Sequence, residues 1–168
     1  MPSFDGISED FLRISSEVVW ATVATVDTRR RPRTRVLHPI WEVVGGRPVG
    51  WIGTSRTPLK QKHLAANPCV SLSYWSPKQE TAHVEARASW ADEERERVWE
   101  MFVDAPPPLG YDPATIPTWK DGPLAGPFSV LRLEPWRVMI LTGEDAASGR
   151  WYERFWRSES EQRLPSRA

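Results

Sequence analysis

Four side chains that can bind a phosphate group fall within six consecutive residues near the middle of the chain. Ser55 and Thr57 carry hydroxyl groups, and Arg56 and Lys60 carry positive charges. Thr57 is a favoured helix N-cap residue, and Pro58 suits the first helical position. The free N–H groups at the start of that helix would join these side chains, so the spacing predicts a phosphate site at a helix N-terminus.

The charges of this helix are the reverse of what an isolated helix prefers. A helix N-terminus is partly positive and favours acidic residues, whereas this one carries Arg56, Lys60 and Lys62 and no acid. The arrangement costs roughly a few tenths of a kcal/mol per charge, and a bound anion would make it favourable. The alternative is a solvated, lysine-rich surface helix, which is a common feature of proteins.

The residues around this helix predict the order strand, turn, helix and strand. Residues 49–54 are apolar and β-prone, and residues 70–75 alternate between apolar and polar types as a strand does. Asn67 suits the left-handed residue that ends a helix, and Pro68 prevents the helix from continuing.

A second group of candidate residues lies on an earlier strand, predicted over residues 33–41. Successive residues of a strand face opposite sides, so Arg35 faces one side while Val36 and His38 face the other. Pro39 limits this strand to a sheet edge or a bulge. For His38, a half-exposed strand histidine without a ligand is the alternative.

These segments together resemble the pyridoxamine 5′-phosphate oxidase family of split β-barrels, which bind a flavin or deazaflavin phosphate. The resemblance extends from about residue 18 to the end of the chain. Thr54 matches the threonine that ends a strand in that family. Lys60 matches its phosphate-binding lysine, counted back from Asn67 and Pro68.

The family's serine and arginine positions hold Pro58 and Leu59 here. The candidates to replace them lie just before these positions: Ser55, Arg56 and Thr57. The resemblance also implies a strand that runs along the flavin ring, with Thr54 beneath the ring. The matching residues are Arg35, Val36, Leu37 and His38, of which His38 falls where the family often has a lysine. His83 lies near a position where the family uses a glutamine to contact flavin, and a surface histidine is the alternative.

The resemblance implies an oxidoreductase that is a homodimer with two cofactor sites at the subunit interface. The cofactor would be FMN or the deazaflavin coenzyme F-420, and it would carry the redox chemistry on a small-molecule substrate. The family's true pyridoxamine phosphate oxidases have an Arg-x-His element near the C-terminus. The corresponding residues 142–152 contain Arg150 but no histidine, which argues against vitamin B6 oxidation. No side chain stands out as a general acid or base, so the catalytic residue stays unknown.

The pattern along the whole chain is that of many short strands and few helices, without βαβ alternation. It predicts a mainly β fold, an FMN-binding split β-barrel of six or so antiparallel strands. Residues 1–157 are expected to form a single domain, and residues 158–168 a disordered tail. Strands are expected at residues 18–26, 33–41, 49–54, 70–75, 81–90, 128–133, 136–141 and 151–156, and helices at 8–16, 57–67 and 91–102.

Residues 104–127 are rich in proline and glycine, and a loop of this length in a compact domain has a function or is mobile. We expect it to cover the cofactor cleft or the dimer seam, with Tyr111 and Trp119 as contacts. A disordered insertion is the alternative.

Composition limits the remaining classes. The formal net charge of the 168 residues is zero, which argues against a protein made mainly for nucleic acid or an anionic membrane. The single cysteine, Cys69, excludes an internal disulfide and is expected to be a small core residue. No apolar run approaches the ~20 residues that span a bilayer, no signal peptide is visible and no metal-spaced cluster occurs, so we expect a cytoplasmic protein without a metal.

Two alternatives remain from other functional classes. One is a non-catalytic split-barrel protein that binds haem or a flavin, with His38, His63 or His83 as the candidate axial ligands. The other is nucleic-acid binding through the basic residues 29–35, for which a solvated hairpin tip is the simpler explanation.

Overall fold

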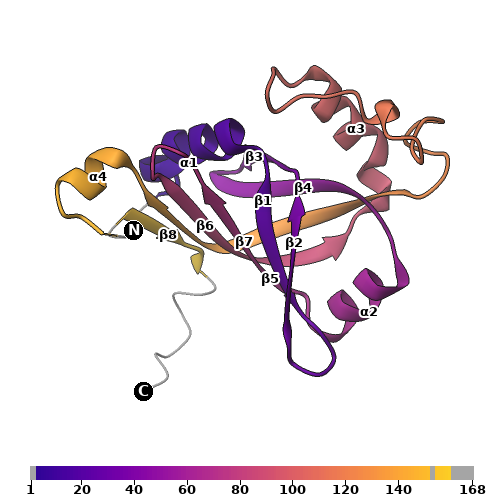
Figure 1. Cartoon of the computed structure of the whole chain (residues 1–168), viewed down its shortest axis with the longest axis horizontal. Coiled ribbons are helices and arrows are strands. Elements are labelled where there is room, and N and C mark those ends of the chain that lie inside the picture. Colours follow the sequence, from indigo (N-terminus) through magenta and orange to yellow (C-terminus); the bar gives the residue numbers. More distant parts are fainter. Residues whose placement is uncertain (1–2, 152–153, 160–168) are drawn as a thin grey trace.

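The computed structural model describes residues 3–151 and 154–159. Eight strands of these residues form one antiparallel sheet in the order β2-β1-β5-β6-β7-β4-β3, with β8 paired to β7 (Figure 1). The strands are β1 (Ala21–Val26), β2 (Pro32–Leu37), β3 (Pro39–Val44), β4 (Arg47–Ser55), β5 (Cys69–Trp75), β6 (Thr81–Trp90), β7 (Phe128–Leu141) and β8 (Arg154–Arg157). The fold class predicted from the sequence is therefore confirmed, although the strand expected over residues 33–41 is two strands and those expected over 128–133 and 136–141 are one.

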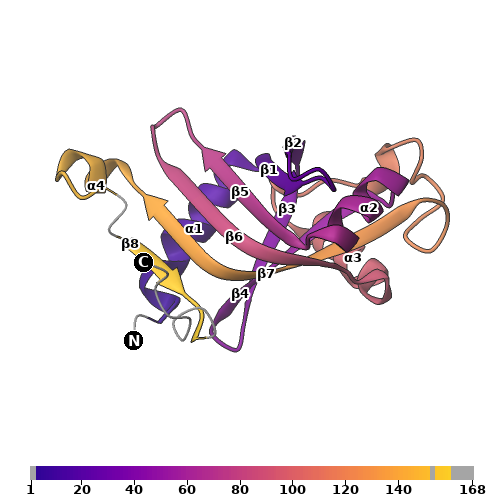
Figure 2. The ribbon, with the colours of Figure 1, turned by 90° about the horizontal axis from the view of Figure 1, so that it is seen from below.

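Four α-helices and two short 3-10 helices complete the described part of the chain. They are α1 (Asp5–Val18), α2 (Pro58–Ala66), α3 (Arg95–Asp104), α4 (Gly143–Ala147), η1 (Asp92–Glu94) and η2 (Pro113–Thr115). Figure 2 shows α2 and α3 at one end of the sheet and α4 with β8 at the other. No helix of the described residues is long and apolar enough to cross a membrane.

The two edge strands of the main sheet, β2 and β3, are consecutive in the chain. His38 is the single residue between them. The sheet must therefore curl until its two edges meet at this residue. The single strand expected over residues 33–41 is wrong: Pro39 has no N–H to donate and begins a new strand, where it faces Ile52 of β4.

The main core lies inside this curl. The alternating residues of β5 point inward, with Leu72 and Tyr74 fully buried. The apolar side of α1 closes over them, because Phe11 meets Trp41 edge-on at 5.1 Å and the Trp41 indole N–H donates to the Tyr74 hydroxyl at 2.8 Å. Cys69 lies on the outward row of β5 and is exposed, which corrects its expected place in the core.

A second, smaller core lies between α3, the segment after α3 and the sheet. Val98 and Phe102 of α3 are fully buried, and Trp119 packs edge-on against Phe128 of β7 with ring centroids 5.0 Å apart. Trp119 is 7% exposed. Trp119 therefore anchors the segment over residues 104–127 to the sheet, which contradicts the alternative of a disordered insertion.

Several expected element boundaries also differ. Strand β7 continues through Glu134 and Pro135, because the register shift between Glu85 and Ala86 of β6 accommodates the break there. Asn67 has an extended conformation (φ −150°) instead of a left-handed one. Residues 143–147, expected as a turn, form α4, which Thr142 caps in a capping box with Asp145.

The expected last strand and tail fall partly outside the described residues. Strand β8 covers residues 154–157, whereas the predicted strand at residues 151–156 includes two residues, 152 and 153, that are not described. Of the expected tail, only residues 158 and 159 are described.

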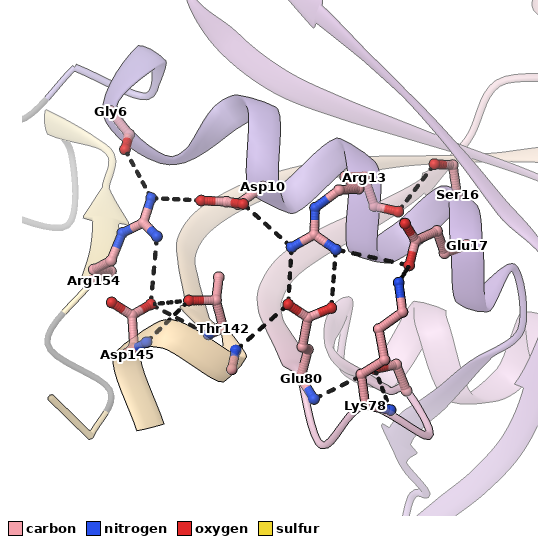
Figure 3. Close-up of polar contacts among 12 residues, drawn as sticks. Gly6, Asp10, Arg13, Ser16, Glu17, Lys78, Glu80, Thr142, Asp145 and Arg154 are labelled. Carbon is pink, nitrogen blue, oxygen red and sulfur yellow. Dashed lines mark hydrogen bonds and ion pairs between the residues drawn. The ribbon is translucent and has the colours of Figure 1, made fainter. Parts of the chain in front are cut away.

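A chain of ion pairs joins α1 to α4, β8 and the loop before β6 (Figure 3). Arg13 of α1 holds both carboxylate oxygens of Glu80, at 2.9 and 3.0 Å. Asp10 bridges Arg13 at 3.2 Å to Arg154 at 2.8 Å, and Arg154 reaches Asp145 at 3.4 Å. Glu80 is 7% exposed and Asp145 2% exposed, so this network fixes α1 and α4 at the end of the sheet.

Candidate functional site

Lys60 is held in the first turn of α2 and reaches back to the end of β4. As predicted, Thr57 caps the helix: its hydroxyl accepts from the Lys60 N–H at 3.4 Å. The Lys60 ammonium donates to the Thr54 hydroxyl and to the Ser55 carbonyl oxygen, the latter at 3.1 Å. These contacts aim the half-buried ammonium at the rim of the curled sheet.

Arg35 of β2 lies beside this lysine. Its Nη2 donates to the hydroxyl of Thr25, a buried residue of β1, at 3.0 Å. Arg35, Thr25 and Lys60 line the same small cavity inside the sheet, together with Leu37. Sequence reasoning singled out Arg35 and Lys60 but missed Thr25, although the inward alternation of β1 could have indicated it.

The two cations face each other without an acidic partner. Burial lowers the pKa of Lys60, and the neighbouring Arg35 charge lowers it further. Burial also lowers the pKa of Arg35. In the described residues neither side chain forms an ion pair with a carboxylate. Desolvated like charges that share no counter-ion are unfavourable, so this arrangement fits an anion such as a phosphate, with Thr54 and Thr25 as nearby hydroxyls.

A larger pocket adjoins this pair of cations. Its volume is about 440 Å³, which is within the range of small-molecule sites. Thr54 connects the two, because it lines the pocket and contacts Lys60. Most of the wall is apolar or aromatic, and its residues are Val19, Trp20, Val36, Leu37, His38, Gly53, Thr54, Pro108, Tyr111, Ile116 and Trp119.

His38 forms part of this wall and is surrounded by rings. It stacks on Tyr111 with centroids 5.1 Å apart and meets Phe102 edge-on and Trp20 at an angle, each also at 5.1 Å. It is 9% exposed, which contradicts the alternative of a half-exposed strand histidine. Burial lowers the pKa of His38, and a hydrogen bond to the Leu109 backbone partly opposes that shift.

Comparison with known proteins bears on the architecture that holds this site. No protein-family model matches the sequence, and no curated protein matches it. Solved structures do match. A pyridoxamine 5′-phosphate oxidase-related, FMN-binding protein from Nostoc punctiforme is 14% identical over 84% of this chain and 85% of that chain, with a TM-score of 0.59.

Two further solved structures that match are named for other ligands. An F420 reductase is 16% identical, with a TM-score of 0.53 over 76% of this chain and 94% of that one. A heme-binding protein from Mycobacterium smegmatis is 19% identical, with a TM-score of 0.58 over 96% of this chain and 60% of that one. The chain has the split β-barrel fold of pyridoxamine 5′-phosphate oxidase-like proteins.

Within this split barrel, the predicted site residues divide into two groups. Arg35, Thr54 and Lys60 meet at the cation pair, and Val36, Leu37 and His38 line the pocket. Tyr111 and Trp119, the two contacts expected from the segment after α3, also line this pocket. Trp20 and Pro108 join the wall without any sequence signal that pointed to them.

Two predicted residues lie elsewhere in the split barrel. Arg56 turns away from Lys60: it forms an ion pair with Asp92 at 3.3 Å and lies 4.4 Å above the Trp90 ring. His83 is half-buried on β6, between Ser73 and Met139 of the neighbouring strands, and lines neither the pocket nor the cavity. Burial lowers the pKa of His83. The two remaining predicted residues contact Lys60 directly: the Ser55 carbonyl oxygen accepts from its ammonium, and the Thr57 hydroxyl accepts from its backbone N–H.

Proposed function

We propose that this chain is a flavin- or deazaflavin-dependent oxidoreductase of the pyridoxamine 5′-phosphate oxidase-like family. The observation that carries the proposal is the partly buried pair Arg35 and Lys60, which has no acidic partner in the described residues and borders a pocket of about 440 Å³. A phosphate-bearing cofactor with a flat ring fits both features at once.

The residues present fit such a cofactor in distinct roles. Arg35 and Lys60 would hold the phosphate by charge-assisted hydrogen bonds, with the hydroxyls of Thr25 and Thr54 beside them. Val36 and Leu37 would line the ring, and the aromatic wall would exclude water from it. When bound, the cofactor supplies the hydride or electron transfer, and the protein orients it.

The choice between FMN and coenzyme F-420 is part of the proposal. Both carry a phosphate and a tricyclic ring, so both suit the cation pair of Arg35 and Lys60 and the adjoining pocket. Vitamin B6 oxidation is a poor fit, because Arg150 is already held by Asp145 at 3.2 Å and no histidine accompanies it.

We also propose that the working form is a homodimer. Val36 and Trp20 line the pocket, yet they remain 62% and 59% exposed. Large apolar side chains at the mouth of a pocket fit a second subunit that covers them.

Titration of the purified apo-protein with FMN, and separately with coenzyme F-420, tests the proposal. Flavin or deazaflavin fluorescence reports binding, and riboflavin serves as the control that lacks the phosphate. Tight binding of FMN alone would direct the substrate search to oxidisable amines and electron donors. Tight binding of the deazaflavin alone would indicate a hydride-transferring reductase, and binding of neither would refute the proposal.

A non-catalytic haem-binding protein is the second candidate. The observation that favours it is His38, whose Nε2 has no hydrogen-bond partner and which lines an apolar pocket. Addition of haem would then shift its absorption spectrum, and His38→Ala would abolish the shift while His63→Ala and His83→Ala would not.

A further inference from the structure

Two polar nitrogens in the pocket wall have no partner. Among the described residues, the buried side-chain atoms without a hydrogen bond include His38 Nε2 and Trp119 Nε1, and both residues line the pocket. Both residues are buried, since His38 is 9% exposed and Trp119 7% exposed. A buried polar group left unpaired is costly and calls for an explanation.

The two nitrogens are opposite in hydrogen-bonding character. The indole Nε1 of Trp119 carries a hydrogen and can only donate. The Leu109 backbone bond raises the pKa of His38, so the ring donates to the Leu109 carbonyl. Since Nε2 is the nitrogen without a partner, Nδ1 carries that hydrogen, and the Nε2 of the neutral ring is an acceptor.

The rest of the wall is suited to a flat ligand. Tyr111 stacks on His38, and the ring of Trp20 meets the histidine at a tilt. Aromatic faces bind planar rings by stacking.

We infer that His38 and Trp119 read the edge of a planar ring that carries one hydrogen-bond donor and one acceptor. The ligand's N–H or O–H donates to His38 Nε2, and its carbonyl or ring nitrogen accepts from Trp119 Nε1. The inference extends the proposed function and depends on it only for the binding of the phosphate by Arg35 and Lys60. The ring is either that of the cofactor or that of a substrate bound beside it.

Two substitutions at residue 38 distinguish a hydrogen bond from His38 to the ligand from a purely structural role of the histidine. The amide nitrogen of His38→Asn stands in for Nδ1 and keeps the bond to Leu109, but removes the acceptor at the Nε2 position. His38→Gln places an amide oxygen near the Nε2 position and gives up the Leu109 bond. Trp119→Phe removes the donor and keeps an aromatic ring.

Two binding measurements identify whether His38 and Trp119 bind the ring of the cofactor or that of a substrate. The first titrates the apo-proteins with riboflavin, which has the ring without the phosphate and therefore does not depend on Lys60. The second titrates FMN-loaded proteins with 2-quinolone, a neutral planar lactam with one N–H donor and one carbonyl acceptor, and follows tryptophan fluorescence. A lost neutral hydrogen bond weakens binding by roughly two- to tenfold.

We expect His38→Asn and Trp119→Phe to weaken one of the two probes by that factor while His38→Gln stays near wild type. Loss for riboflavin assigns the pair to the cofactor ring, and loss for 2-quinolone alone assigns it to the substrate. Unchanged binding of both probes would overturn the inference, as would an equal loss in His38→Gln. If wild-type protein bound no flavin, the proposed function would fail, and the 2-quinolone titration of unloaded protein would still decide this inference.

Discussion

Arg35 lies close enough to Lys60 for its positive charge to lower the pKa of the lysine, although the two residues come from β2 and α2. The barrel therefore brings two cations together at its rim before any ligand is present. Such a pair opposes folding slightly and favours anion binding, and the first two predictions follow from it.

Lys60→Ala should weaken FMN binding and leave riboflavin binding unchanged. A charge-assisted hydrogen bond contributes ~1.5–3 kcal/mol, which corresponds to a loss of roughly ten- to over a hundredfold in affinity. Fluorescence titration measures both ligands. Lys62→Ala is the matched control, because Lys62 is an exposed lysine of the same helix. Equal losses for riboflavin and FMN would show that Lys60 does not read the phosphate.

Arg35→Met should remove the stabilisation of the protein by FMN without lowering the stability of the ligand-free chain. Removing one of two like charges relieves repulsion, and the methionine keeps much of the packing volume. A ligand at 100 times its Kd stabilises the folded state by ~2.7 kcal/mol, so a rise in melting temperature with FMN is expected for wild type alone. Thermal unfolding with and without FMN measures this, and an FMN-induced rise as large in the variant as in wild type would contradict it.

Stability at acid pH should depend on the ion pairs in Figure 3. The Arg13 guanidinium lowers the pKa of Glu80 below its usual 4.5. Burial alone would raise the pKa of Asp145, but the hydrogen bonds from Thr142 and Arg150 and the charge of Arg154 together lower it. Their contribution is complete above the unfolded-state pKa and is lost as pH falls through the folded one. Glu80→Gln should therefore flatten the fall in melting temperature below the usual glutamate pKa. Glu93→Gln, at an exposed glutamate, should leave that fall unchanged.

The buried histidines should add a second pH dependence nearer neutrality. Burial lowers the pKa of His38 and of His83 below the usual 6.5. The unfolded chain takes up these protons first as the pH falls, so their contribution is present above pH 6.5 and decreases below it. Melting temperatures between about pH 7.5 and 5.5 should show this slope. His38→Gln should reduce it in part, and an unchanged slope would count against the burial of this ring.

Gly110→Ala should displace the segment that forms one wall of the pocket. A Cβ at residue 110 would stand 1.8 Å from the Ala105 carbonyl oxygen, a backbone atom that cannot step aside alone. We expect a loss of about 1–3 kcal/mol in unfolding free energy, together with weaker riboflavin binding. Gly6→Ala is the control, because a Cβ there meets nothing within 4 Å in α1 and should stabilise the chain by ~0.5–1 kcal/mol.

The sequence predicts the local features of this molecule well. Thr57 caps α2, Pro58 begins it, and the alternation of β5 and β6 places the expected residues inside the barrel. Each of these features depends on neighbouring residues and on a fixed period, so a single sequence contains the necessary information. The fold class follows from the same patterns.

Contacts between residues that lie far apart in the chain could not be predicted from the sequence. Arg56 was expected beside the phosphate, yet Trp90 at the end of β6 and Asp92 just after it hold it. Trp20 joins the site because the sheet curls, and no local pattern encodes that curvature, whereas the alternation of β1 could indicate only that Thr25 faces inward. The single residue between β2 and β3 was also hidden, since its neighbours read as one continuous strand.

The one-residue junction at His38, between β2 and β3, limits which sequence changes the fold can accept. His38 closes the barrel and also faces the pocket, so the length of the chain at this point is fixed while the residue type is not. Because β4 fixes the register of β3, one inserted residue would have to bulge out at the junction or shift β3 against β4, which would turn its inward side chains outward. A substitution of His38 would keep the closure and change only the side chain that faces the pocket, so this fold can alter its ligand at one position without altering its architecture.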